Sequence, residues 1–121
     1  MTARSESGSA VVEFALVVPV VLIVLLGVVD VALLARSQLE VVGAAREGAR
    51  QAAVSPDPAD AVAAVRSALG SRGALAAVSV SRPSVVGAPA EVVVRLEHAL
   101  GSWFGGVGVQ LTGRATMRVE Q

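Results

Sequence analysis

Glu13 is the side chain whose place in the sequence most demands a chemical explanation. It directly precedes residues 14–29, a run of sixteen residues without a polar side chain. A charged carboxylate costs roughly 2.5–3.5 kcal/mol at the middle of a bilayer and less near its surface. We therefore expect Glu13 to have a binding partner or a specific role. Gly8 lies five positions earlier, and because glycine has no Cβ it lets the backbone of another protein approach closely.

Residue types that support catalysis or metal binding are scarce. The chain has no cysteine and one histidine, His98, which argues against a thiolate nucleophile, a disulfide or a His-rich metal site. The glycines around Trp103 lack the lysine and the helix start that a phosphate-binding loop needs. Ten Arg and ten Asp or Glu cancel to a formal charge of zero, which argues against nucleic-acid binding. We expect no enzyme, no cofactor and no metal.

The apolar run and its flanks are long enough to span a membrane. Residues 9–35 form a mostly apolar stretch whose only charges are Glu13 and Asp30. At about 1.5 Å per helical residue the stretch exceeds a hydrocarbon layer of about 30 Å. Two other interpretations are a buried helix of a soluble protein and a cleaved secretory signal. Pro19 removes one backbone hydrogen bond within the stretch, so we expect a kink there.

The residues around Glu13 resemble a known processing site. The sequence from Gly8 to Phe14 is GSAVVEF, which resembles the G/xxxxE[YF] site of type IVb prepilins and pseudopilins. Two further segments, AAREGAR at 44–50 and ATMRVE at 115–120, together with this site resemble the TadE-like family, the minor pseudopilins of tight-adherence (Flp) pilus systems.

The resemblance implies a function and partners. Prepilin peptidase would cut after Gly8, leaving Ser9 as the first residue, with Glu13 and Phe14 completing the processing site. Glu13 would then pair with the free amine of a neighbouring pilin or pseudopilin subunit; a partnerless carboxylate that reaches to the membrane surface is the alternative. The Tad membrane assembly platform and, indirectly, the secretion ATPase would be further partners. The competing function class is a single-pass membrane protein whose outer domain binds a ligand or acts as a sensor.

The pattern along the chain predicts four segments: a leader at 1–8, a membrane segment at 9–35, an extramembrane helical continuation and linker at 36–56, and a small outer domain at 57–121. One helix should run over residues 9–54. Within it, small residues favour the close approach of another helix, although the helix propensity of alanine explains them equally well. The residues predicted to pack against other subunits are Glu13, Pro19, Ala45, Gly48, Ala49 and Ala53.

The outer domain should combine a short helix with a sheet, which makes the fold class α+β. Asp57 as N-cap, Pro58 and a stop at Gly70 predict a helix over 58–69. Three segments then alternate apolar and polar residues, as strands of a half-buried antiparallel meander do. The short helix, with or without part of the long one, should cover the apolar face of this meander. The apolar positions predicted to face the core are Val62, Val65, Leu69, Ala61 and Ala68 in the helix, and Val78, Val80, Val92, Val94, Leu96, Val109, Leu111, Ala115, Met117 and Val119 in the strands.

Two questions of placement stay open in the sequence. Trp103 either closes one end of the sheet or forms, with Phe104, an exposed patch that contacts another subunit; His98 is interpreted as a residue at the edge of a loop. The resemblance implies a single-pass cell membrane protein with a cytoplasmic N-terminus and an extracytoplasmic outer domain, which could also enter an extracellular pilus. The positive-inside rule favours the opposite orientation, because one Arg precedes the membrane segment and three follow its apolar part (Arg4 against Arg36, Arg46 and Arg50).

Overall fold

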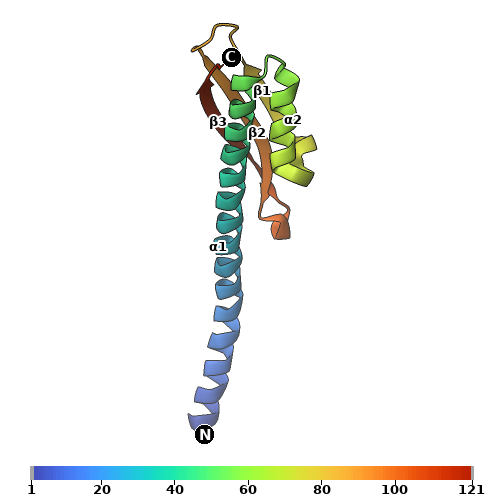
Figure 1. The fold of residues 1–121 in the computed structure, drawn as a ribbon. Coiled ribbons are helices and arrows are strands. Elements are labelled where there is room, and N and C mark those ends of the chain that lie inside the picture. Colours follow the sequence, from blue (N-terminus) through green and yellow to red (C-terminus); the bar gives the residue numbers. More distant parts are fainter. Residues whose placement is uncertain (1, 121) are drawn as a thin grey trace.

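The computed structural model describes residues 2–120, with side chains from Ser7 onward. A long helix leads into a small head made of a second helix and a three-stranded sheet (Figure 1), which confirms the predicted α+β class. The elements are α1 (Thr2–Val54), α2 (Pro58–Leu69), η1 (Gly70–Leu75), β1 (Ala77–Ser81), β2 (Pro89–Leu100), η2 (Ser102–Phe104) and β3 (Val107–Arg118).

Helix α1 is a single element of 53 residues that belongs to two environments. It begins at Thr2, so the predicted leader continues helically into the predicted membrane segment. It also continues through Pro19, and Figure 1 shows no sharp bend where a kink was expected. The N-terminal part of α1 extends away from the head, whereas the C-terminal part lies against the sheet and α2 (Figure 1).

The sheet is the predicted antiparallel meander with strand order β1-β2-β3. In its register Val80 lies opposite Val92, and Leu96 lies opposite Leu111. The alternate residues Val92, Val94 and Leu96 of β2 are buried beneath the two helices, as the alternation predicted.

Helix α2 begins and ends as predicted. The Asp57 side chain accepts a hydrogen bond from the backbone N–H of Ala59 at 2.9 Å, and Pro58 occupies the first turn, where no N–H is needed. Gly70 ends the helix with φ of 64°. Two of the predicted core positions are wrong, since Ala68 on α2 and Met117 on β3 are exposed.

The C-terminal turns of α1 form the centre of the head's core. Its buried residues there are Val41, Ala44, Ala45, Gly48, Ala49, Ala52 and Ala53. Most are alanines, so the helix axis can approach the sheet and α2 closely. The C-terminal segment of the chain contacts the same end of α1, because the backbone N–H of Glu120 donates a hydrogen bond to the carbonyl of Ala53 at 2.7 Å.

Candidate functional site

The residues predicted for processing lie exposed on the N-terminal part of α1. Gly8, Ser9, Glu13 and Phe14 all face outward, far from the head. Within residues 7–120, no ion pair or side-chain hydrogen bond involves Glu13. A Cβ placed on Gly8 would meet no described atom within 4 Å, so packing of the chain gives no reason for glycine at this position. The glycine and the carboxylate are thus both accessible to another molecule.

The apolar run that follows Glu13 is uncovered. One helix of the described part of the chain is long and apolar enough to cross a membrane, and none of its most apolar stretch is buried. This contradicts a buried helix inside a folded soluble domain, because the head contacts the later part of α1, at Asp30 and from Leu34 onward. A large apolar surface of this kind is exposed only where a membrane or a partner protein covers it.

The small residues predicted to contact other subunits serve instead in the chain's own core, which corrects that expectation. Ala45, Gly48, Ala49 and Ala53 are buried. A Cβ on Gly48 would lie 2.5 Å from Val65 Cγ2 of α2. The close neighbour that these small residues admit is therefore α2 of the same chain. Glu13 and Pro19, by contrast, are exposed and stay candidates for contact with another subunit.

The β2–β3 hairpin reaches back along α1 to Asp30. One carboxylate oxygen of Asp30 accepts hydrogen bonds from the backbone N–H of Gly101 and from Trp103 Nε1, both at 3.1 Å. Trp103 and Phe104 are both exposed, so they do not close the end of the sheet; the alternative of an exposed aromatic pair describes their position. No pattern in the sequence indicates the bond from Trp103 to Asp30, because 73 residues separate the two side chains.

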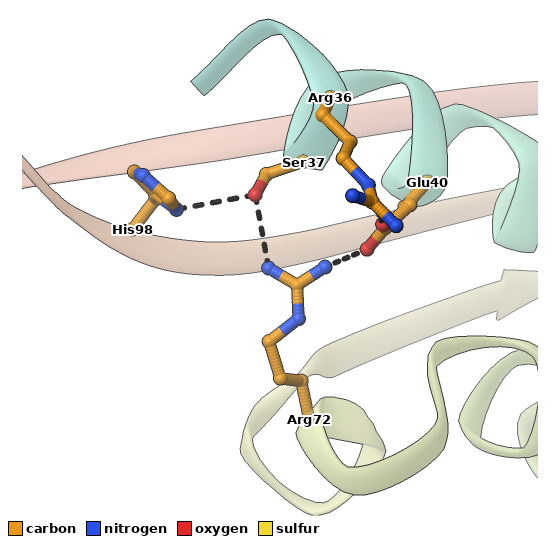
Figure 2. A network of polar contacts seen from close by, with 5 residues as sticks. All are labelled: Arg36, Ser37, Glu40, Arg72 and His98. Atoms are coloured by element: carbon orange, nitrogen blue, oxygen red, sulfur yellow. Dashed lines mark hydrogen bonds and ion pairs between the residues drawn. The ribbon is translucent and has the colours of Figure 1, made fainter. Parts of the chain in front are cut away.

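A polar network joins α1, η1 and β2 about two helical turns after Asp30 along α1 (Figure 2). Arg72 donates to Ser37 Oγ at 3.0 Å and forms an ion pair with Glu40, which also binds Arg36 at 3.3 Å. Ser37 Oγ lies 3.2 Å from His98 Nδ1. Since arginine can only donate, the Ser37 hydroxyl proton is left to donate to His98 Nδ1 when that nitrogen carries no proton. His98 is a strand residue, so its interpretation as a loop-edge residue was wrong.

Away from this network, the described residues form a hollow but no cluster of metal ligands. Among the described residues, no group of three or more His, Cys, Asp or Glu side chains is placed to hold a metal ion. A hollow of about 530 Å³ beside the hairpin is lined by Leu75, Glu97, Ala99, Gly105, Gly106 and Gly108. Glu97 is its only ionisable lining residue.

The apolar part of α1 is uncovered, and the C-terminal part of the same helix packs in the core of an α+β head. A protein with this arrangement can be anchored in a membrane by a single helix. A family model described as "TadE-like protein" matches residues 8–50, from Gly8 to the end of the AAREGAR segment. The match confirms the predicted resemblance to the TadE-like family, which is associated with Tad pilus systems. No curated protein and no solved structure matches the chain.

Proposed function

We propose that the chain is a minor pseudopilin, stored in the membrane and processed by prepilin peptidase, that takes part in assembling a Tad/Flp type IVb pilus. One observation carries the proposal: Gly8 and Glu13 are both accessible at the end of an uncovered apolar helix, inside the matched segment, and Glu13 has no polar partner among residues 7–120. In this role α1 crosses the membrane with residues 1–8 in the cytoplasm, and the head lies outside.

Processing would change the charge at the membrane surface. Hydrolysis of the Gly8–Ser9 peptide bond consumes one water, leaves a carboxylate on Gly8 and creates an α-amino group on Ser9. Glu13 then lies four residues from the new amine, about one helical turn along the same face of α1. Its carboxylate can neutralise the amine of a neighbouring subunit, which would fix the axial offset between subunits in a fibre. The fibre subunits, the assembly platform and, indirectly, the secretion ATPase are the proposed partners.

Leader cleavage is the direct test. The full chain is coexpressed in membranes with a prepilin peptidase, and its N-terminus is determined by sequencing. We expect the mature chain to begin at Ser9, and Gly8→Leu to block cleavage because a side chain then occupies the cut position. Gly27→Leu is the matched control, since a Cβ at Gly27 also meets no atom within 4 Å. A chain that still begins at Met1 would favour a membrane-anchored binding or sensor protein instead.

A further inference from the structure

The tip of the β2–β3 hairpin, residues 100–107, is an uncharged part of the head, and residues 102–107 of it are exposed. No Asp, Glu, Lys or Arg occurs between His98 and Arg114. Trp103 is 46% exposed and Phe104 is 61% exposed. Val107 beside them is also exposed. Large apolar side chains on one uncharged loop indicate a surface that a membrane or another molecule covers.

The tip has a defined shape that holds the two aromatic rings in place. Gly101, Gly105 and Gly106 adopt positive φ angles of 64°, 117° and 75°, which residues with a Cβ rarely adopt. The carbonyl of Gly101 accepts hydrogen bonds from the backbone N–H groups of Phe104 and Gly106, at 3.0 and 2.9 Å. The rings of Trp103 and Phe104 meet edge to face with centroids 4.8 Å apart. The loop therefore presents the rings as a unit.

Asp30 determines where along α1 the tip lies. Its carboxylate binds both Gly101 and Trp103, and Figure 1 shows the tip as the part of the head that extends furthest toward the N-terminal end of α1. Asp30 is the first charged residue after the apolar run 14–29. Because a hydrocarbon layer of about 30 Å takes about 20 helical residues, a layer centred on this run ends close to Asp30. Trp103 thus lies at the level where hydrocarbon gives way to lipid headgroups.

We propose that the hairpin tip is a second membrane-binding element, in which Trp103 and Phe104 enter the headgroup region of the phospholipid leaflet on the head side of α1. Aromatic side chains favour this region because an apolar ring meets hydrocarbon while a polar edge keeps a hydrogen bond, here from Trp103 to Asp30. The tip would hold the head against the membrane surface while the subunit is stored. The inference rests on the membrane location in the proposed function, and it is independent of leader cleavage and fibre assembly.

Trp103 is the chain's only tryptophan, so its fluorescence reports on the tip alone. The full chain is reconstituted into phosphatidylcholine/phosphatidylglycerol nanodiscs at one chain per disc. Acyl chains brominated near the headgroup end should quench the Trp103 emission strongly, and acyl chains brominated near the methyl end should quench it less. Aqueous iodide should quench weakly, and the emission maximum should lie to the blue of that of free tryptophan in water.

A matched control moves the tryptophan to the other end of the sheet. Val86 is exposed in the connection between β1 and β2, which lies at the end of the sheet opposite the tip (Figure 1). In the double variant Trp103→Phe/Val86→Trp, we expect strong iodide quenching and no quenching by brominated lipid. Circular dichroism of both proteins verifies that the fold is unchanged. Resistance to alkaline extraction from vesicles verifies separately that α1 is embedded in the membrane. Extraction of the protein under these conditions would reject the membrane location itself.

Three outcomes overturn the proposal. Iodide quenching of Trp103 as strong as that of the Val86→Trp control would place the tip in water. A blue-shifted emission without quenching by brominated lipid would show that protein covers the tip. In vesicles, emission that changes only as the protein-to-lipid ratio rises would identify a second copy as the partner.

Discussion

Gly48 shows how one missing side chain sets the distance between two helices. A Cβ at this position would lie 2.5 Å from Val65 Cγ2 and 3.1 Å from Val92 Cγ1. Both valines are fully buried, and β-branched side chains have few alternative rotamers, so neither can move aside cheaply. Gly48 is therefore needed for packing within the chain, even though a glycine in the middle of a helix usually weakens it.

Gly48→Ala should lower the free energy of unfolding of the head. Forcing a methyl group into a packed core costs about 1–3 kcal/mol, and the better helix propensity of alanine returns about 1 kcal/mol. We expect a net loss of up to about 2 kcal/mol, measured by thermal unfolding of the full chain in detergent. Gly43→Ala on the same helix should be neutral or stabilising, because a Cβ there meets nothing within 4 Å. Equal effects of the two substitutions would contradict this account of Gly48.

The sequence predicted single residues well where their role is local. Asp57, Pro58 and Gly70 bound α2 as expected, because caps and stops depend on neighbours in the chain. Ala68 and Met117 were misplaced in the core: both are exposed, although the later positions Leu69 and Val119 of the same two patterns are buried. The bond from Trp103 to Asp30 was not predicted, since it depends on how far the hairpin extends along α1.

At the scale of elements, α1 is both the apolar anchor and the spine of the head. The sequence predicted the order and type of the principal elements, because hydrophobic periodicity differs between helices and strands. It left open whether part of α1 lies on the sheet, since the buried positions of its C-terminal turns are mainly alanines, which are also common on exposed helices. The small residues were accordingly assigned to contacts between subunits.

This dual role predicts that the head does not fold stably without α1. Residues 57–121 alone should unfold at a much lower temperature than residues 36–121, because the shorter chain lacks Val41 and the buried alanines of α1. Thermal unfolding followed by circular dichroism checks this.

In the longer chain, Val41→Ala should lower the free energy of unfolding by about 2 kcal/mol, from the lost burial and the cavity left behind. Leu39→Ala at an exposed position should change stability by less than about 0.5 kcal/mol. Equal melting temperatures of residues 57–121 and residues 36–121 would mean that α1 does not stabilise the sheet.

At the scale of the whole molecule, the distribution of charge and the proposed function favour opposite orientations. Three arginines follow the apolar run, and Arg36 and Arg50 lie in ion pairs with Glu40 and Glu47, at 3.3 and 4.0 Å. Acidic residues count little in the positive-inside rule, so these pairs do not remove the conflict. We expect the proposed function to prevail, because a pilus subunit must present its head outside the membrane.

A reporter fused after Gln121 measures this orientation. Alkaline phosphatase, which is active only outside the cytoplasm, should be active in this fusion, while a cytoplasmic fluorescent reporter at the same place should be dark. The same pair of reporters fused before Met1 should give the reverse result and serves as the control. Phosphatase that is inactive after Gln121, with a fluorescent reporter that is bright there, would exclude the pilus role.

Glu13 connects the cost of one charge to the assembly of many subunits. Within residues 7–120 its carboxylate has no partner, and the adjacent residues Val12 and Phe14 are apolar. Burial of α1 among other subunits would raise the cost of this charge unless the amine of a neighbouring Ser9 neutralises it.

Glu13→Ala should therefore leave membrane insertion intact or improve it, yet impair pilus formation. Glu13→Gln should act similarly if charge matters more than hydrogen bonding. Val12→Ala, at the adjacent exposed position, should leave piliation unchanged. The measurement is piliation of strains that express each variant at matched levels, with leader removal verified in each. Normal pili from Glu13→Ala would show that no charge pair sets the offset between subunits, because the subunits would then assemble on apolar contacts alone.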